Sequence, residues 1–169
     1  MKLNFKMKLK DKIALVSAAG RGIGKAIVEG LAAEGATVIV NSYSEETASR
    51  TASDIEKKGG KAISMPGDAT DPNEILDLVR KTTEKFGRID ILVNNVGAAP
   101  KETPEIPDHA MGKTEGLWNA MYKQNLLPTV LMTEAVSEEM KRQKEGKVVN
   151  ISSIAGIDSF SPKTLTNLV

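Results

Sequence analysis

The sequence contains no cysteine, which excludes disulfide bonds, thiolate catalysis and cysteine-based metal sites. Its one histidine, His109, stands alone in a proline-containing stretch, so no metal site is expected. Aromatic residues make up only 4% of the chain, and the core must therefore be built from aliphatic side chains. No apolar run approaches the roughly 20 residues of a membrane-spanning helix. We therefore expect a cytoplasmic protein with no membrane partner.

The sequence also lacks a large net charge of either sign. Lys and Arg number 23 and Asp and Glu number 22, a balance that offers no electrostatic reason to expect nucleic acid as a partner. The basic start MKLNFKMKLKDK resembles the first part of a signal peptide, but the apolar run that follows, Ile13–Val16, is too short for one. A chain of 169 residues can bury a sizeable core, and one domain over residues 1–169 is expected.

Two kinds of segment alternate along the chain. Short β-branched apolar runs occur at Ile13–Val16, Thr37–Val40, Ala62–Met65, Ile89–Val93 and Lys147–Ile151. Longer stretches with helical periodicity lie between them, at 22–34, 45–58, 71–86 and 115–143. Continuous apolar strands separated by helices predict an α/β fold, with a parallel sheet covered by helices on both faces.

Residues that begin and end helices support these boundaries. Asp71-Pro72 predicts a helix start, and Gly35, Gly59 and Gly87 each follow a predicted helix. In the first helix, Ile23, Ile27, Val28 and Leu31 recur at the spacing of one helical face. The proline-containing segment 98–116 is predicted to be a long surface loop.

A glycine-containing loop, VSAAGRGIG, connects the first strand to the first helix. In that position glycines let the backbone approach a phosphate, and the helix N-terminus supplies free N–H groups and a positive dipole end. The loop therefore indicates dinucleotide binding. The alternative is a glycine turn that only lets the strand and the helix pack closely.

The end of the second strand distinguishes between the two nicotinamide dinucleotides. A carboxylate at this place accepts a hydrogen bond from the ribose 2′-OH of NAD(H). The stretch VIVNSYSEE has none at the strand end, where Asn41, Ser42 and Tyr43 stand, and Arg21 lies in the glycine loop. A neutral pocket beside an arginine favours the 2′-phosphate, so NADP(H) is favoured over NAD(H). The alternative is that Arg21 is an ordinary solvated loop residue.

Two further stretches follow predicted strands. Asn94 and Asn95 in IDILVNNVG can bridge neighbouring strand ends and line a cofactor cleft, although asparagine is equally common as a turn residue. Asp68 in GDATD can hydrogen-bond an adenine edge, or can simply form a turn before the helix that Asp71 begins.

Taken together, SAAGRGIG, GDATD, NNVG, WNAMYKQNL and GKVVNISSIAG occur in an order that resembles the short-chain dehydrogenase/reductase family from about residue 10 to about residue 156. The resemblance implies a Rossmann-type doubly wound parallel sheet with strand order 3-2-1-4-5, continuing to 6-7 in complete members. It also implies hydride transfer between nicotinamide and a small-molecule carbonyl or alcohol substrate, and a homo-oligomer. Nothing in the residues selects the 3-oxoacyl-acyl-carrier-protein reductases as a subset.

The resemblance also assigns roles to residues. Asn125 and Ser153 match two of the family's four catalytic residues, Asn, Ser, Tyr and Lys. The residues matching its cofactor contacts are Ser17, Arg21, Gly22, Ile23, Gly24, Asn41, Ser42, Asp68, Ala69, Asn94 and Gly97.

This sequence departs from the family in two ways. Ala18 stands where a glycine is usual, at a cost of about 1 kcal/mol or more if its φ is positive. The Tyr-x-x-x-Lys motif is absent, since Tyr43 and Tyr122 are followed four residues on by Thr47 and Leu126.

We therefore expect a chain that stops before the catalytic Tyr and Lys and is inactive by itself. Lys147–Ile151 should then be an edge strand with apolar side chains on both faces. The alternative is a catalytically inactive nucleotide-binding module that senses or scaffolds.

Overall fold

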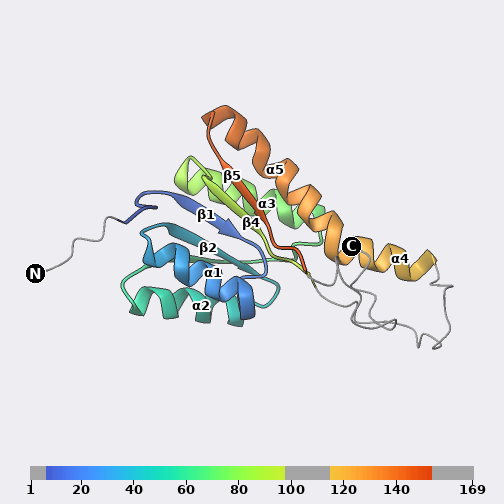
Figure 1. Cartoon of the computed structure of the whole chain (residues 1–169), viewed down its shortest axis with the longest axis horizontal. Coiled ribbons are helices and arrows are strands. Elements are labelled where there is room, and N and C mark those ends of the chain that lie inside the picture. Colours follow the sequence, from blue (N-terminus) through green and yellow to red (C-terminus); the bar gives the residue numbers. More distant parts are fainter. Residues whose placement is uncertain (1–6, 98–114, 154–169) are drawn as a thin grey trace, which may run out of the picture.

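The computed structural model describes residues 7–97 and 115–153, and in these ranges the chain forms one parallel sheet of five strands between helices (Figure 1). The strands are β1 (Ile13–Val16), β2 (Thr37–Ser42), β3 (Lys61–Pro66), β4 (Ile91–Asn94) and β5 (Lys147–Asn150). Their order in the sheet is β3-β2-β1-β4-β5. The predicted fold class and strand order are confirmed. The proline-containing loop and His109 lie outside the described residues.

Helices cover the sheet on both faces. The helices α1 (Gly22–Ala33) and α2 (Glu45–Lys57) lie on one face, and α3 (Pro72–Phe86) and α5 (Leu127–Gln143) lie on the other (Figure 1). Alternate side chains of each strand point to opposite faces, so Ala14 and Val16 join the core beneath α1 and α2, whereas Ile13 and Leu15 join the core beneath α3 and α5. The two aliphatic cores hold the sheet between its helices.

Local signals account for the predicted helix ends. The Asp71 carboxylate accepts a hydrogen bond of 2.7 Å from the Asn73 N–H, and Pro72 occupies the first helical position, where no N–H is needed. Gly87 ends α3 in the left-handed conformation, with φ of 71°, and its N–H donates to the Thr83 carbonyl. These predicted boundaries are confirmed to within a residue or two.

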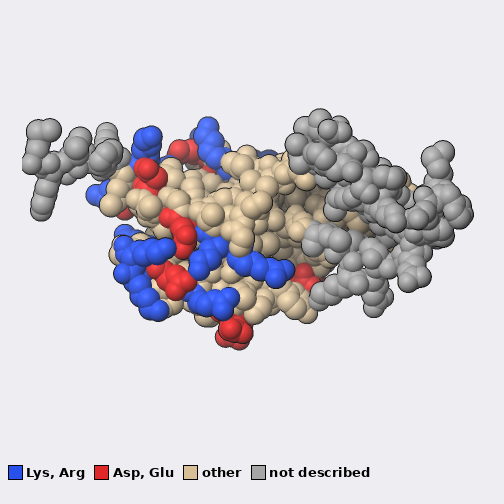
Figure 2. Space-filling model, turned by 60° about the horizontal axis from the view of Figure 1, so that its bottom comes forward, with Lys and Arg blue, Asp and Glu red and all other residues tan. Residues whose placement is uncertain are grey.

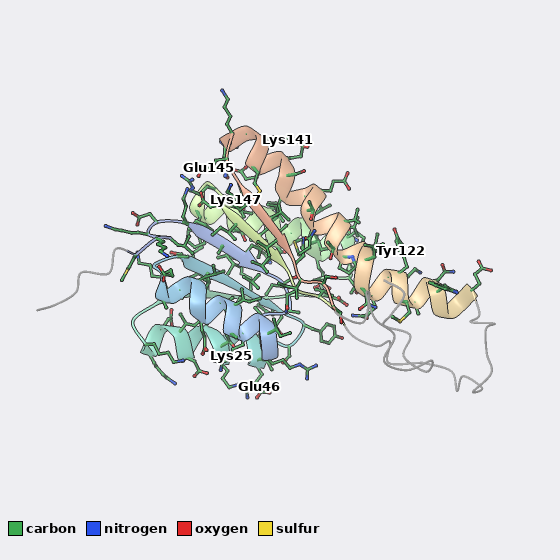
Figure 3. All side chains as sticks on the ribbon, viewed as in Figure 1. Lys25, Glu46, Tyr122, Lys141, Glu145 and Lys147 are labelled. Carbon is green, nitrogen blue, oxygen red and sulfur yellow. The ribbon has the colours of Figure 1, made fainter. Side chains whose placement is uncertain are left out.

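The predicted helix 115–143 is wrong as a single helix. It is divided into α4 (Glu115–Met121), the π-helical turn η1 (Tyr122–Leu126) and α5. Pro128 has no N–H to donate, so the ordinary helical ladder cannot continue through it, and the Leu127 N–H donates to the Tyr122 carbonyl five residues back. Tyr122 lies at the junction of the two helical segments (Figure 3). The proline thus places an irregular turn inside an otherwise continuous helix.

At one end of the sheet, β5 pairs with no described strand other than β4, and all four of its residues are exposed. Val148 and Val149 point to opposite faces, and neither is covered in the described part of the chain. The predicted edge strand with apolar side chains on both faces is confirmed.

The surface carries both signs of charge together. Figure 2 shows Lys and Arg side chains interleaved with Asp and Glu side chains. Two ion pairs, Lys25–Asp54 at 2.7 Å and Lys58–Glu29 at 3.0 Å, connect α1 to α2. In the two ranges described, no helix is long and apolar enough to cross a membrane.

Candidate functional site

A cavity of about 760 Å³ opens at the carboxyl ends of β1, β4 and β5. Its volume lies in the range of small-molecule and cofactor sites, and the carboxyl ends of parallel strands are where open α/β sheets bind ligands. The residues that line it come from the β1–α1 loop, the end of β4, the η1–α5 junction and the end of β5. They are Ala18, Arg21, Gly22, Ile23, Asn95, Val96, Gly97, Asn125, Leu126, Thr129, Asn150, Ile151, Ser152 and Ser153.

The β1–α1 loop begins with a strained turn. Ala18 has φ of 51°, in the left-handed region where an alanine costs about 1–2 kcal/mol relative to an ordinary conformation. The turn is nevertheless tied down on both sides. The Ser17 N–H donates to the Val93 carbonyl at 3.1 Å, and the Ala19 N–H donates to the Asn41 carbonyl at 2.7 Å. Ala18 therefore does occupy a conformation that suits glycine, and it does so at the wall of the cavity.

The N-terminus of α1 meets the cavity immediately after this turn. Arg21 precedes the helix in an extended conformation and makes no side-chain cap, and the first turn contains no acidic residue. The free N–H groups and the positive end of the helix dipole are therefore not neutralised by the first turn itself. Arg21, Gly22 and Ile23 all line the cavity. Ile23 is 64% exposed, although it shares the helical spacing of the buried Val28.

Three asparagines connect the strand ends. The Asn94 side chain is buried, and its amide donates to the Thr133 hydroxyl and to the Asn150 side-chain oxygen, both at 2.9 Å. It thereby joins β4 to α5 and β5. The Asn95 side-chain amide donates instead toward the β1–α1 turn, to the carbonyls of Ser17 and Ala18. The predicted bridging by the asparagine pair is confirmed, and Asn95 rather than Asn94 faces the cavity.

The two predicted catalytic residues reach the same cavity from different elements. Asn125 lies in the π-helical turn η1, and its side-chain amide donates to the Met121 carbonyl at 3.1 Å. Single π-helical turns are often found at functional sites because they turn a side chain out of the regular helical register. Ser153 follows the end of β5 and is exposed.

The predicted adenosine-side residues lie outside the cavity. The Asn41 side chain donates to the carbonyls of Met65 and Gly67, both at 3.2 Å, and its oxygen is buried without a hydrogen-bond partner in the described part of the chain. The Ser42 hydroxyl lies 2.8 Å from the Thr47 hydroxyl.

Asp68 and its neighbours also lie outside the cavity. The Asp68 carboxylate accepts hydrogen bonds from the Thr70 N–H at 2.8 Å and from the Thr70 hydroxyl at 2.7 Å. This is the turn role that the sequence offers as an alternative to adenine binding. Ala69 is buried in the core beneath α3.

Ser17 and Gly24 support the loop rather than line the cavity. The Ser17 hydroxyl accepts from the Asn95 N–H at 3.0 Å, so it ties the end of β1 to the segment after β4. A Cβ added at Gly24 would meet the Ala18 carbonyl oxygen and the Asn95 amide nitrogen, closer than real Cβ atoms approach. Gly24 therefore lets α1 begin directly against the turn.

Asn95, predicted as half of the NNVG pair to line a cleft, lines the cavity. Several other lining residues were not predicted. Asn150 carries a signal, because it directly precedes ISS. Thr129 has none, because its direction depends on how the π-helical turn changes the helical register. Val96, Leu126, Ile151 and Ser152 complete this set.

Comparisons with known proteins agree with this geometry. The short chain dehydrogenase family matches residues 12–164, and the chain belongs to that family. A 3-oxoacyl-[acyl-carrier-protein] reductase from Synechocystis sp. is 39% identical over 150 residues, covering 88% of this chain and 58% of that protein. The 3-oxoacyl-[acyl-carrier-protein] reductase FabG of Escherichia coli is 36% identical over 150 residues, covering 89% of this chain and 58% of that protein.

Solved structures show the same fold. The crystal structure of gox2181 superposes with a TM-score of 0.83 at 31% identity, covering 93% of this chain and 59% of that one. A 7α-hydroxysteroid dehydrogenase complexed with NADH and 7-oxo glycochenodeoxycholic acid gives a TM-score of 0.81 at 28% identity, covering 92% and 58%. The chain thus spans less than two thirds of the length of the relatives that it matches.

Proposed function

We propose that this chain forms the dinucleotide-binding part of an NAD(P)(H)-dependent oxidoreductase that transfers a hydride between nicotinamide and a carbonyl or alcohol substrate. The observation that carries the proposal is the cavity itself, which brings the N-terminus of α1 together with Asn125 and Ser153. Phosphate groups suit the free N–H groups of the helix end, and the aliphatic wall of Ile23, Val96 and Ile151 suits an aromatic ring.

The residues of the cavity have separable tasks in this reaction. A bound nicotinamide would supply or accept the hydride. The Ser153 hydroxyl can donate a hydrogen bond to the substrate oxygen, and Asn125 can hold a water beside it. Proton delivery requires a further group, since neither Tyr43 nor Tyr122 is followed four residues later by lysine. We therefore expect the 169 residues to bind dinucleotide without turning over substrate.

NADPH is the proposed preference. Arg21 is exposed at the start of α1, and the end of β2 carries the hydroxyl of Ser42, next to that of Thr47 in α2, rather than a carboxylate. Fluorescence titration of the chain with NADPH and NADH tests this preference. Arg21→Gln should weaken NADPH binding by about tenfold or more, the worth of one charge-assisted hydrogen bond, and should change NADH binding little. Tighter binding of NADH than of NADPH by the parent chain would refute the preference.

A homo-oligomer is proposed from the outer face of the helix that contains the π-helical turn. Trp118, Tyr122, Leu126 and Val130 recur every four residues along it, and each is close to half exposed. Such a stripe is typical of a surface that packs against another helix. Sedimentation of the parent and of Trp118→Glu tests it, because a charge in an apolar interface should shift the population toward monomer. The cytoplasm is the proposed compartment, and cell fractionation tests it.

A second candidate is a catalytically inactive module that binds dinucleotide to sense or scaffold. The absence of Tyr-x-x-x-Lys from these 169 residues favours it. The mass of the protein isolated from its natural source separates the two candidates. A mass close to that of 169 residues, with dinucleotide binding and no turnover, would support the module; a longer protein with turnover would support the enzyme.

A further inference from the structure

The turn after β1 raises a structural question, because Ala18 is held at φ of 51°, which alanine rarely adopts. A glycine would occupy this conformation without restraint. An alanine relaxes toward ordinary backbone angles unless its surroundings prevent it. The turn lines the cavity next to the N-terminus of α1, so a relaxed turn would also alter the surface offered to a ligand.

The hydrogen bonds of the neighbouring residues fix the two ends of the turn but not its middle. The N–H groups of Ser17 and Ala19 donate to β4 and β2, respectively. Between them lie the Ser17 and Ala18 carbonyls, which belong to the two peptides that flank the Ala18 Cα. The torsion angles of Ala18 set how these peptides are turned relative to each other, so the directions of both carbonyls distinguish the strained conformation from a relaxed one.

Asn95 holds both carbonyls. Its side-chain amide donates to the Ala18 carbonyl at 3.3 Å and to the Ser17 carbonyl at 3.4 Å. The amide is oriented by these contacts, since the reversed orientation would place its oxygen against two carbonyl oxygens. Gly24 leaves just enough room for both groups, because a Cβ there would overlap the Ala18 oxygen and the Asn95 nitrogen.

We propose that Asn95 is a positioning residue of the dinucleotide site, which acts by holding Ala18 in the left-handed conformation. The ligand in this statement rests on the proposed function, whereas the restraint on Ala18 does not. Asn95 sets the fraction of molecules whose β1–α1 turn is arranged for a pyrophosphate, and the apparent dissociation constant rises as that fraction falls. Because alanine gains by relaxing and glycine does not, the affinity depends on Asn95 strongly with Ala18 and weakly with glycine at this position.

The test is a double-mutant cycle of Asn95→Ala and Ala18→Gly. NADPH titration should show Asn95→Ala weakening binding by about tenfold in the parent and by about twofold in the Ala18→Gly background, the difference reflecting the strain of a left-handed alanine. In the ligand-free protein, Asn95→Ala should also accelerate amide hydrogen exchange of segment 16–22, by about tenfold in the parent and by about twofold in the Ala18→Gly background. Thr129→Val, which removes a hydroxyl from the α5 side of the same cavity, is the matched control and should show no coupling to Ala18→Gly.

The outcomes separate the two proposals. Equal losses in both backgrounds, or unchanged exchange in Asn95→Ala, would overturn the role of Asn95 while leaving the proposed function standing. The parent chain could bind neither NADPH nor NADH while Asn95→Ala still accelerates exchange more with Ala18 than with glycine at that position. That result would overturn the proposed function and support the restraint on Ala18. If Asn95→Ala does not fold, Asn95→Ser takes its place, since serine is too short to reach both carbonyls, and the same coupling is expected.

Discussion

The amino ends and the carboxyl ends of the parallel strands are surrounded by different kinds of side chain. At the amino end, charged groups neutralise one another around Asp90, which is 3% exposed and accepts hydrogen bonds from the Ile13 N–H and the Arg88 guanidinium, both at 2.9 Å. At the carboxyl end, amides and hydroxyls surround a cavity of about 760 Å³. Paired charges stabilise the amino end, whereas at the carboxyl end the polar side chains around the cavity, Arg21 among them, can bind a ligand.

The amino end is tied together across elements far apart in sequence. Lys12 lies 3.2 Å from Asp90 and 3.0 Å from Glu145, and these two carboxylates, Glu145 first, raise its pKa. The Gln143 side chain pairs with both the N–H and the carbonyl of Ile89 at 2.9 Å. Glu145 and Lys147 lie together where β5 begins (Figure 3). The α5–β5 connection is thereby joined to the starts of β1 and β4.

Among the variants that test the difference between the two ends, Asp90→Ala should have the largest effect on the stability of the protein. It leaves the Ile13 N–H without its acceptor and removes one of the two carboxylates that Arg88 and Lys12 approach, the other being Glu145. Breaking a buried pair from one side costs about 3–5 kcal/mol, which corresponds to a fall in Tm of very roughly 10 °C for a chain of this size. Urea and thermal denaturation measure it, and NADPH affinity at low temperature should stay unchanged because the cavity lies at the other end.

The matched control is Asp77→Ala on the exposed surface of α3. Asp77 pairs with Arg80 and Lys81 one turn on, and all three side chains are exposed. Exposed pairs of this kind contribute little, so denaturation should be almost unaffected. Similar losses from Asp77→Ala and Asp90→Ala would contradict the view that burial makes the amino end stable.

At the carboxyl end, Gly24→Ala should lower dinucleotide affinity, which Asp90→Ala should leave unchanged. Its Cβ would collide with the Ala18 carbonyl and the Asn95 amide, so the turn must move. Overpacking of this sort costs about 1–3 kcal/mol of stability, and dinucleotide binding should fall by more than tenfold because the displaced groups border the cavity. Gly22→Ala isolates backbone strain, since Gly22 has φ of 55° but open space around its Cα. Binding that survives Gly24→Ala would show that the turn does not contribute to the site.

A smaller effect is expected from acid. Burial alone would raise the pKa of Asp90, but hydrogen bonds from Arg88, the Ile13 N–H and Lys12 outweigh it and lower the pKa. A carboxyl with a lowered folded-state pKa contributes stability that is present above its unfolded pKa, about 3.9, and is lost as pH falls below that value. The unfolding free energy of the parent should therefore fall more steeply between pH 4 and pH 2 than that of Asp90→Asn, as urea titrations at each pH would show. Parallel curves would refute the prediction.

How far the sequence predicted the structure also differs between the two ends. Helix starts and glycine stops depend on neighbouring residues, so the roles of Asp71 and Gly87 could be predicted from the residues themselves. The strand order came only from the resemblance to the family. That Asn95 bridges strand ends could be predicted from the NNVG pair, but the atoms that it contacts could not. Its contact with the β1–α1 turn joins residues 77 positions apart and depends on the register of β1 with β4.

Two features show how a visible signal can still mislead. Pro128 stood in the sequence, but the register change that it brings to Asn125 and Thr129 could not be derived from periodicity, which assumes an unbroken helix. Ile23 fitted the apolar spacing of α1 because the pattern does not show that the first turn of that helix projects beyond the sheet into the cavity.

The smallest effect is expected from Ala18→Gly. Relief of the left-handed alanine contributes about 1–2 kcal/mol, and the greater freedom of glycine in the unfolded chain offsets about 0.4–1 kcal/mol of it. The net result should be a gain in unfolding free energy of about 0.5–1 kcal/mol, measured by urea denaturation. NADPH affinity should not decrease, since the conformation of the turn is retained.

The opposite substitution, glycine to alanine at Gly30, tests the stability estimate made for Ala18→Gly. Gly30 lies in α1 with ordinary helical angles, and a Cβ at this position would have nothing within 4 Å, so Gly30→Ala should also gain about 0.5–1 kcal/mol. Opposite substitutions then stabilise the same loop–helix segment, because φ is positive at one site and helical at the other. A loss of stability in Ala18→Gly beside a gain in Gly30→Ala would mean that Asn95 and the neighbouring hydrogen bonds hold Ala18 without strain, and the reason given for its dependence on Asn95 would fail.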